Sequence, residues 1–305
     1  MSNAGKNNSG KSVGLWEDAA RRFVKNKLAV CGLIFFIILI LISISTIIID
    51  IVTDNAVYND YVVKQNLANK LAKPSLQNIF GCDEFGRSIF FRMIWGTRYS
   101  LFIGIVAILI STVAGGILGA VAGYYGGKID NVIMRFMDVF LAIPSMVMAI
   151  AVVAALGTST FNLLLSIAIP QIPRFARIVR VSVMSVKDME FIEAAKAVGA
   201  KDKLIIFGYI LPNAMAPIIV QATLGTANAI LAIAGLSYLG LGVQPPTPEW
   251  GSILTSAKTY IRDAWHISVI PGIGIMLTIL SLNLFGDGLR DALDPKLKNE
   301  DGDLL

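Results

Sequence analysis

The chain has 305 residues, of which 55% are hydrophobic and 15% charged, and its mean hydropathy is +0.69. Soluble domains carry about 25% charged residues, so this composition excludes an ordinary soluble domain and indicates a protein embedded in a bilayer. The formal net charge of +5 does not indicate a nucleic-acid partner, because multi-span membrane proteins collect Lys and Arg in their cytoplasmic loops.

Residues 5–12 read GKNNSGKS and fit the phosphate-binding pattern G-x-x-x-x-G-K-[ST]. A working loop of this kind follows a β-strand and opens a helix, whose N-terminus and backbone N–H groups hold the phosphates. Only residues 1–4 precede the stretch, which is too few for a buried strand, and residues 2–14 have the composition of a disordered tail. We interpret the match as a chance pattern.

Long charge-free runs follow this tail. A membrane-spanning helix needs about 20 apolar residues, because every backbone polar group must be satisfied inside the helix. The fourth expected span is the least apolar, since Arg174, Arg177 and Arg180 enter its last turns. We expect six spans: one each in residues 28–49, 99–127, 204–248 and 267–286, and two in residues 139–173 and beyond, separated by a turn at GTSTFN in residues 157–162.

Six spans place both termini on one side of the membrane, and the distribution of positive charges selects that side. With the N-terminus inside, 18 of the 26 Lys and Arg residues lie in inner segments and 8 in outer segments. We therefore expect an all-α polytopic membrane protein with six transmembrane helices and with both termini in the cytoplasm.

Small residues and prolines mark helix contacts and bends in these spans. Gly115, Gly119 and Gly123 are four apart and form a flat stripe where another helix backbone can approach closely. Packing within this chain is the favoured interpretation, and contact with another subunit is the alternative. Prolines end or kink helices, so we expect bends or ends at Pro144, Pro170, Pro173, Pro212 and Pro217.

Ionisable groups at mid-membrane mark ion or proton pathways, and the expected spans hold no acidic residue or histidine near their middles. Asp138 and Asp287 are expected at the cytoplasmic ends of the third and sixth spans. This distribution argues against a stand-alone secondary transporter or channel. His266, beside Trp265 at the edge of a span, is the single histidine. It cannot build a metal site or a catalytic pair alone, and we expect it at the membrane interface.

The longest inner loop contains a short amphipathic helix. Ser185 and Asp188 have the spacing of a capping box, and Gly199 is a natural stop. Such a helix shows an apolar side and carries alanines that let another surface come close. On physical grounds alone, a helix lying on the membrane surface and a helix docking on a partner are equally favoured. The expected apolar side consists of Met189, Ile192, Ala195 and Val198.

Specific residues of this loop decide between the two interpretations. Glu193, Ala194 and Ala195, followed by Gly199 and then by Leu211 and Pro212, resemble the EAA loop of ABC-importer permeases. In that family the loop forms the coupling helix, which docks in a cleft of the ATP-hydrolysing subunit. One departure is Tyr209, which replaces the isoleucine usual three residues before the proline.

Other stretches resemble the dipeptide/oligopeptide/nickel importer family, and specifically its "C"-type permease. FGCDEFGRSIFFRMIWGTRYSL in residues 80–101 is similar to the family's G-T-D-x-x-G-R-D segment, with Cys82 in place of the Thr and Ser88 in place of the final Asp. GLSYLGLGVQPPTPEWGSIL in residues 235–254 and NLFGDGLRDALDPKL in residues 283–297 are similar to the family's last outer loop and C-terminus.

The resemblance implies a type I ABC-importer permease, which forms half of a peptide pathway in a prokaryotic cell membrane and is not itself catalytic. It implies four kinds of partner: a homologous second permease, two ATPase subunits that bind ATP and Mg, an extracytoplasmic substrate-binding protein and the lipid bilayer. No cofactor is expected on this chain. The implied segments are the tail 1–27, the first transmembrane helix 28–50, the outer loop 51–98, the five-helix core 99–290 with its coupling loop at about 182–212, and the tail 291–305.

The resemblance also implies roles for individual residues. Glu193 is expected to meet a cation or a backbone amide on the ATPase, with a solvated surface acid as the alternative. Asp138, Asp287 and Arg290 are expected to give polar support on the cytoplasmic side. Beyond the sixth span, Asp287, Arg290, Asp291 and Asp294 are expected to pair among themselves or with the EAA loop, with a solvated tail as the alternative. The outer stretches 53–98 and 241–266 would face the binding protein, and the QPPTPEW segment is equally a plug or a helix lead-in. Nickel chelates, glutathione and opines remain alternative substrates.

Overall fold

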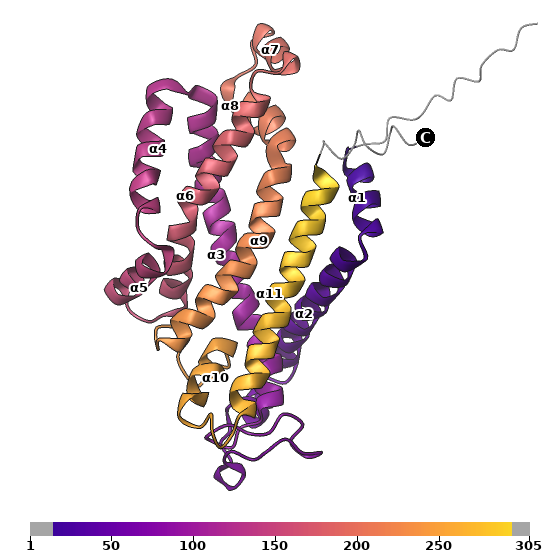
Figure 1. The fold of residues 1–305 in the computed structure, drawn as a ribbon, viewed down its shortest axis with the longest axis vertical. Helices are drawn as coiled ribbons and strands as arrows, with labels where there is room; N and C mark the ends of the chain where they lie inside the picture. The colour runs from indigo at the N-terminus through magenta and orange to yellow at the C-terminus, as the bar shows by residue number, and fades with distance from the viewer. Residues whose placement is uncertain (1–14, 295–305) are drawn as a thin grey trace, which may run out of the picture.

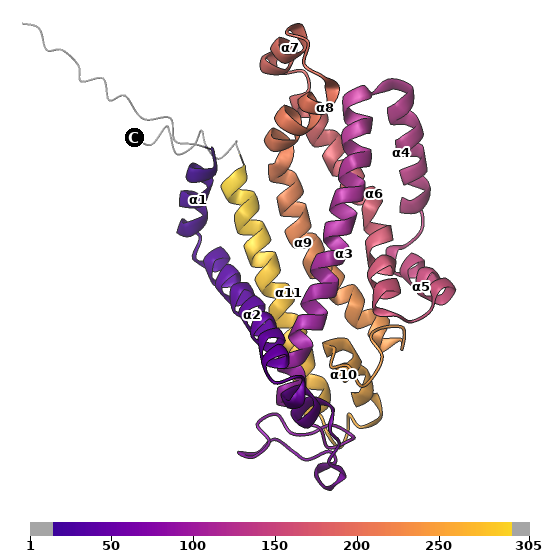
Figure 2. The same cartoon turned by 180° about the vertical axis from the view of Figure 1, so that it is seen from behind.

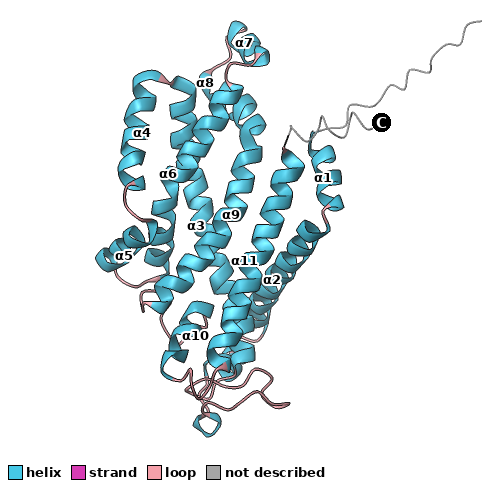
Figure 3. Ribbon diagram, viewed as in Figure 1, coloured by secondary structure: helices cyan, strands magenta, loops and turns pink. Residues whose placement is uncertain are grey.

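The computed structural model describes residues 15–294, and helices account for most of them (Figure 3). Within that range no strand forms, and an isolated antiparallel bridge joins Cys82 to Ser88. The GKNNSGKS stretch lies outside the described residues. The α-helices are α1 (Leu15–Lys25), α2 (Lys27–Val52), α3 (Ile89–Tyr125), α4 (Gly127–Leu141), α5 (Ser145–Leu156), α6 (Thr160–Val186), α7 (Glu190–Ala197), α8 (Asp202–Leu204), α9 (Leu211–Tyr238), α10 (Trp250–Ser256) and α11 (His266–Leu293). The shorter elements are the π-helices η1 (Tyr58–Val63) and η3 (Ile205–Ile210) and the 3-10 helices η2 (Leu67–Asn69) and η4 (Ala257–Thr259).

The long helices α2, α3, α6, α9 and α11 run side by side along the long axis of the molecule (Figures 1 and 2). The segment α7–α8–η3 lies at one end, together with α1 and the C-terminal end of α11; we call this the α7 end. Residues 53–88 and 239–265, which include α10, lie at the opposite end; we call this the loop end. The α7 end and the loop end therefore lie at opposite ends of one helical bundle.

Four helical segments of the described chain are long and apolar enough to cross a membrane: α2, α3, Asp202–Tyr238 and α11. The bent pair of α4 and α5 adds a fifth if it counts as one span. Helix α6 has 27 residues and is about 40 Å long at the helical rise per residue. Its arginines make α6 less apolar than the other long helices, and α6, although long enough, does not meet the hydropathy criteria for a span. The expected count of six spans therefore depends on counting α6 as the sixth.

The expected third span is not one straight helix beginning near residue 139. Helix α4 begins already at Gly127 and ends at Leu141, and the chain bends by 86° before α5. Pro144 lies at this break, as the N-cap residue of α5. A proline lacks the N–H that would continue a helix, which explains why the helix is interrupted here. The turn expected at residues 157–162 is confirmed: Gly157 follows α5 with φ +89°, and the Ser159 hydroxyl accepts a hydrogen bond from the Asn162 amide at the start of α6.

The other expected prolines do not break their helices. Helix α6 runs through Pro170 and Pro173, and α9 runs through Pro217. Pro212 stands in the first turn of α9, where its missing N–H costs nothing. The sequence therefore predicted that five prolines would bend or end helices, but it did not distinguish Pro144, where the helix breaks, from the four prolines that lie within helices.

The glycine stripe of α3 packs against α6 of the same chain. A Cβ atom added at Gly115 would lie 2.6 Å from the Ile172 carbonyl oxygen, and one added at Gly119 would collide with the Ala176 carbonyl oxygen. Real Cβ atoms do not approach backbone this closely, so only glycine permits the contact. The favoured interpretation, helix packing within the chain, is confirmed.

Buried charges hold the loop end together. Asp83, Arg87 and Arg92 are 1%, 5% and 3% exposed. Arg87 Nε donates to Asp83 Oδ2 at 2.7 Å, and Arg92 Nε lies 3.5 Å from the same oxygen. Arg92 also donates to the carbonyl oxygens of Val62 and Pro246, at 3.3 and 3.2 Å. One arginine of α3 thus joins both segments of the loop end.

The QPPTPEW segment leads into α10. Glu249 accepts hydrogen bonds from the Gly251 and Ser252 amides, both at 2.8 Å, and thereby caps the helix. The same carboxylate accepts from the hydroxyls of Ser100 and Ser237, at 3.1 and 2.8 Å. Of the alternatives weighed for this segment, the structure thus supports the helix lead-in.

His266 is the first residue of α11 and so lies at the edge of a candidate span, as expected, but its side chain is fully buried within the protein. Its Nε2 atom lies 3.3 Å from the Cys82 carbonyl oxygen. The neighbouring Trp265 is the exposed member of the pair. The reason is that the loop 53–88 folds back over the start of α11 and covers the imidazole, a long-range contact that the apolar pattern around His266 does not reveal.

Candidate functional site: a coupling surface and a cavity

Helix α7 projects beyond the ends of α6 and α9, at the tip of the molecule (Figure 1). It is eight residues long and ends shortly before Gly199, whose φ of +81° is the left-handed conformation of a helix stop. The expected stop is therefore confirmed. The expected capping box is wrong, because Ser185 still belongs to α6 and its hydroxyl donates to the Ser182 carbonyl oxygen at 2.8 Å. Met189 precedes α7 instead and supplies no side-chain cap.

The expected apolar side of the coupling helix is only half right. Ile192 is fully buried and Ala195 is half-buried, but Met189 and Val198 are 46% and 84% exposed. Both ends of the expected stripe lie outside α7, which begins at Glu190 and ends at Ala197. Ile192 is therefore the buried contact between α7 and the bundle, and the Lys196 ammonium adds a contact with the Tyr124 ring of α3, 5.8 Å from its centroid; a continuous apolar stripe is absent from α7.

Ile192 belongs to a buried cluster that joins five elements: α3, α6, α7, η3 and α9. The cluster includes Val179 and Val183 from α6 and Ile210 from η3. Two tyrosines from the end of α3 add polar contacts to the same region: Tyr124 and Tyr125 donate to the two carboxylate oxygens of Asp202, at 2.9 and 3.1 Å. These contacts were missed at the sequence level, since no local pattern connects residues nearly eighty positions apart.

The residues of the EAA pattern lie together on the exposed surface of α7 and of the turn after it. Glu193 and Ala194 are exposed, and the Glu193 carboxylate makes no hydrogen bond or ion pair with any of residues 15–294. Ala195 is half-buried, and a Cβ at Gly199 would meet nothing within 4 Å. Leu211 and Pro212 lie behind this surface at the start of α9, where Leu211 packs against the Ile192 cluster.

Large apolar side chains are also exposed around α7. Apolar surface that a monomer leaves uncovered marks a site of protein or membrane contact. Together with the unpaired carboxylate of Glu193, they give the α7 end a mixed surface with an apolar part and an acidic part. The exposed apolar residues are Met189, Phe191, Val198, Leu204 and Phe207.

The three polar residues expected at the cytoplasmic side lie in different places. Asp138 is not at the α7 end: it stands in the last turn of α4, which runs away from that end, and its carboxylate accepts from Arg177 at 2.8 Å. Asp287 and Arg290 are exposed and lie in the last two turns of α11 rather than beyond it. Within residues 15–294, neither forms an ion pair with the EAA residues or with Asp138.

A stronger pair was missed. Arg180 on α6 donates from Nε and Nη2 to the two carboxylate oxygens of Asp130 on α4, at 2.5 and 2.6 Å. Asp130 and Asp138 both lie within α4, so Asp138 lies near the end of a helix that starts at Gly127 rather than, as expected, at the beginning of a third span that starts near residue 139. The two carboxylates are neutralised by arginines of the neighbouring α6, which explains why charged residues are tolerated in both helices.

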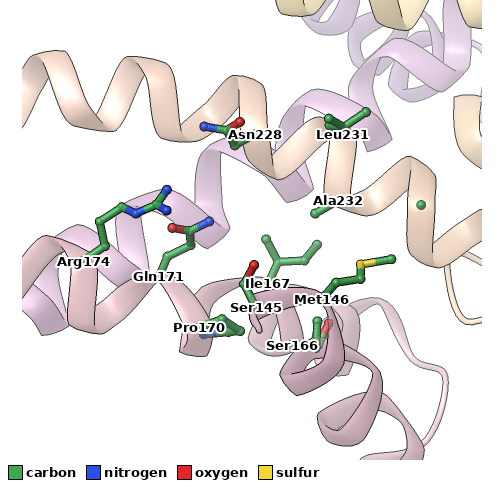
Figure 4. A pocket seen from close by; sticks show the side chains of 12 residues that line it. Ser145, Met146, Ser166, Ile167, Pro170, Gln171, Arg174, Asn228, Leu231 and Ala232 are labelled. Carbon is green, nitrogen blue, oxygen red and sulfur yellow. The ribbon is translucent and has the colours of Figure 1, made fainter. Parts of the chain in front are cut away.

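A cavity of about 490 Å³ opens between α5, α6 and α9 (Figure 4). Its lining is mainly apolar, with a few polar side chains among them. Figure 4 shows that the polar ends of Gln171 and Arg174 extend from α6 toward α9, from which Asn228 faces the same space. The lining residues are Ser145, Met146, Ala149, Ser166, Ile167, Pro170, Gln171, Arg174, Asn228, Leu231, Ala232 and Gly235.

Within residues 15–294, no group of three or more His, Cys, Asp and Glu side chains could hold a metal ion. Cys82, which stands where the resembled motif has a threonine, is buried against the loop end. Burial, reinforced by the neighbouring Asp83 carboxylate, raises the pKa of its thiol. The thiol therefore stays protonated near neutral pH and fills space as a small apolar group.

Comparison with known proteins identifies the family. Residues 115–299 match the model of the binding-protein-dependent transport system inner membrane component, which covers more than half of the chain. The chain belongs to this permease family. Residues 14–74 additionally match the N-terminal TM domain of oligopeptide transport permease C, which agrees with a first helix placed ahead of the permease core. The resemblance read from the EAA loop is confirmed.

Individual relatives cover nearly the whole chain. The dipeptide transport system permease protein DppC of Alkalihalophilus pseudofirmus is 47% identical over 288 residues, which are 94% of this chain and 92% of the relative. The glutathione transport system permease protein GsiD of Escherichia coli O157:H7 is 44% identical over 284 residues, 93% and 91% of the two chains. A chain of the MetNI methionine ABC transporter, solved in inward facing conformations, superposes with a TM-score of 0.55 at 19% identity. That match covers 68% of this chain and 98% of the other, and it shows the shared type I permease fold.

Proposed function

We propose that this permease forms half of the translocation pathway of an ABC importer for peptides and couples that pathway to ATP hydrolysis by partner subunits. The observation that carries the proposal is the geometry of α7. The helix projects from the bundle and exposes Glu193 and several apolar side chains. It is anchored through the single buried side chain of Ile192. A surface of this kind suits a protein partner, and its anchor suits the transmission of a displacement.

The cluster around Ile192 explains how a displacement of α7 would reach the bundle. Close-packed side chains move as a unit because the interior has little free volume. A shift of Ile192 therefore displaces α6 through Val183 and η3 through Ile210. Closure of two ATPase subunits on ATP and Mg would move α7, and the pathway would switch between inward-facing and outward-facing states, each favoured by a different ligand. ATP and Mg remain on the ATPase subunits throughout.

The proposed assembly contains a homologous second permease, two ATPase subunits and an extracytoplasmic substrate-binding protein. In this arrangement the α7 end faces the cytoplasm of a prokaryote, both termini are inside, and α6 and the bent pair of α4 and α5 complete six spans. The loop end, residues 53–88 and 239–265, would meet the binding protein. The positive charges of the inner segments support this orientation.

Peptides are the proposed substrates because the relatives named for dipeptide transport are similar over nearly the whole chain. Glutathione is the alternative that a relative's name supports, and glutathione is itself a small peptide. Nickel chelates and opines are further alternatives within the same importer type. A stand-alone secondary transporter is the candidate of a different class. It is disfavoured because the acids of α4, Asp130 and Asp138, are engaged by Arg180 and Arg177.

The decisive experiment is ATP-driven uptake by the reconstituted complex. Glu193→Lys is expected to abolish ATP-coupled peptide uptake in vesicles while the permease still inserts, because it reverses the charge presented to the ATPase. Replacing Gly199 with a bulky residue should have the same effect, since its φ of +81° disfavours a side chain. Asp291→Lys is the matched control, because Asp291 is also exposed but lies on α11; it should leave uptake near the wild-type rate.

Two outcomes would contradict the proposal. Peptide uptake that persists at the full rate when the ATPase subunits are omitted would show a stand-alone carrier. Equal loss of uptake in Glu193→Lys and Asp291→Lys would remove any special role of α7. Co-purification of the wild-type permease with two ATPase chains, lost in the Glu193 variant, is the expected supporting result.

A further inference from the structure

Three arginines follow one another along α6 at intervals of three residues, and only two of them have a carboxylate partner. Arg177 pairs with Asp138 at 2.8 Å and Arg180 pairs with Asp130 at 2.5 Å. The guanidinium of Arg174 forms no ion pair or hydrogen bond with a side chain of residues 15–294, and the residue is exposed. The same helix therefore presents two neutralised arginines and one that is available.

The break between α4 and α5 explains the difference. Both carboxylate partners are on α4, which ends at Leu141, and the chain then bends by 86° into α5. No acidic residue follows on α5, whose sequence is SMVMAIAVVAAL. Arg174 consequently faces the space that the bend leaves open, the cavity of about 490 Å³ between α5, α6 and α9.

The position of Arg174 along α6 makes its surroundings informative. The residue lies about halfway between Thr160 and Val186, the two ends of the helix. In the proposed topology α6 spans the membrane, and a charged side chain midway along a span almost always faces the bundle interior or a water-filled cavity, because contact with lipid is costly. The cavity in front of Arg174 therefore suits an aqueous part of the pathway.

The cavity has the chemistry of a site for a small anion-bearing ligand. Ligand sites have volumes of about 300–1,000 Å³ and combine mainly apolar walls with a few converging polar groups. Arg174, Gln171 and Asn228 turn their polar ends into one space (Figure 4). Asn228 Nδ2 donates to the Leu224 carbonyl oxygen of its own helix at 3.1 Å, and its second N–H leaves a donor for a ligand. A guanidinium flanked by amides matches a carboxylate, which it binds through two parallel hydrogen bonds.

We infer that Arg174, with Gln171 and Asn228, forms a carboxylate subsite in the translocation pathway, which holds the C-terminal carboxylate of a peptide in transit. The inference rests on the proposed function and assigns a substrate contact within it. Every linear peptide with a free C-terminus carries this group, so the subsite accepts peptides of different side chains. It disfavours peptides whose C-terminus is amidated, because their terminal group carries no charge for the guanidinium.

The first test is uptake by the complete complex with its binding protein and ATPase subunits in vesicles. A dipeptide and the same dipeptide with an amidated C-terminus are compared. Arg174→Gln should lower uptake of the free dipeptide by at least about tenfold, the loss expected for a charged hydrogen-bond partner, and should leave uptake of the amide at the wild-type rate. Arg174→Lys should recover part of the loss, since a cation without the planar fork remains. Arg177→Gln, which breaks an ion pair instead, should affect both peptides equally.

A second measurement avoids any preference of the binding protein. Leu231 lines the cavity without belonging to the subsite, and it is exposed. Leu231→Cys therefore places a thiol in the cavity, and a water-soluble maleimide should label it in the complex above the background of the wild-type cysteines. The free dipeptide should slow the labelling, the amide should not, and Arg174→Gln should abolish the protection. The labelling rate of the thiol reports occupancy of the cavity directly. A folding defect in Arg174→Gln would change labelling in the absence of peptide, whereas loss of the carboxylate contact alone would leave that rate unchanged.

Three results overturn the subsite. Equal loss of both peptides in Arg174→Gln would assign Arg174 to structure or to a carboxylate of the second permease. Unchanged uptake in Arg174→Gln, or labelling that neither peptide slows, would exclude a carboxylate contact in the cavity. All three are distinct from failure of the proposed function, in which the wild-type complex takes up neither peptide in an ATP-dependent way.

Discussion

The two ends of the bundle differ in the surroundings of their principal charged groups. At the loop end, charged groups are buried and partnered: Asp83, Arg92 and Glu249 are 1–3% exposed, and each makes several hydrogen bonds or ion contacts. At the α7 end, the carboxylate of Glu193 is exposed without a partner among the described residues, and the apolar Val198 is 84% exposed.

This difference indicates which charged and apolar groups find their contacts within the chain and which are left for a partner protein. Burying a charge is favourable only when its partners are present, so the loop end is complete within one chain. Exposed apolar side chains gain free energy only when another surface covers them. The α7 end thus exposes groups that the single chain does not cover. Substitutions there are expected to change docking of a partner without changing the free energy of unfolding of the permease.

Asp83→Ala should produce the largest loss of stability, because it breaks the self-contained loop end. The substitution removes the carboxylate that the buried Arg87 and Arg92 share, and leaves Arg87 with only the more distant carboxylate of Glu84, at 4.0 Å. Removal of one partner from a buried pair costs about 3–5 kcal/mol. Thermal unfolding of the purified permease in detergent, followed by tryptophan fluorescence, measures the loss.

The control for Asp83→Ala lies in the same loop. Asp60 pairs with Lys64 at 3.4 Å, but both side chains are more than 60% exposed. Asp60→Ala should change the free energy of unfolding by about 0–1 kcal/mol. Equal destabilisation by the two variants would show that burial of the charges does not set the stability of the loop end.

A smaller loss is expected where α3 and α6 connect the two ends. A Cβ at Gly119 collides with the Ala176 carbonyl oxygen, so Gly119→Ala must separate the helices; overpacking of this kind costs about 1–3 kcal/mol. Gly116 lies on the same helix, and a Cβ there meets nothing within 4 Å. Gly116→Ala is therefore the matched control and should be neutral or slightly stabilising, as replacement of glycine in a helix normally is. Indistinguishable unfolding temperatures for the two alanine variants would contradict the packing shown by α3 and α6.

Sequence patterns predicted those parts of the fold that depend on local composition. The apolar runs located α2, α3 and α11, and the glycine stripe correctly indicated close packing of α3. They failed where the outcome depends on a distant partner. The break at Pro144 could not be distinguished from Pro170 or Pro173, because whether a helix absorbs a proline depends on what packs beside it.

The candidate site was predicted to a similar extent. The EAA pattern located Glu193 and Gly199 on an exposed helix and turn, because a family resemblance reports a surface as a whole. It did not reveal that Ile192 is the buried contact of α7, nor that Asp202 binds the tyrosines at the end of α3. The capping box failed for a physical reason: α6 continues through Val186, so Ser185 is inside a helix rather than before one.

The smallest effect on stability, and the sharpest contrast between the ends, is expected from the exposed apolar residues of the α7 end. Val198→Ser combined with Phe191→Ser should change the free energy of unfolding by no more than about 0.5 kcal/mol, as surface substitutions generally do. The same variant should no longer co-purify with the ATPase subunits, because the exposed Phe191 and Val198 side chains contribute little to folding but supply apolar surface for docking.

Leu76→Ser is the control: Leu76 is fully exposed at the loop end, so the variant should be equally stable and should retain the ATPase subunits. Retention of the ATPase subunits by both variants would move the docking surface away from α7. A large destabilisation by the double variant would show instead that the α7 end, like the loop end, is completed within the chain.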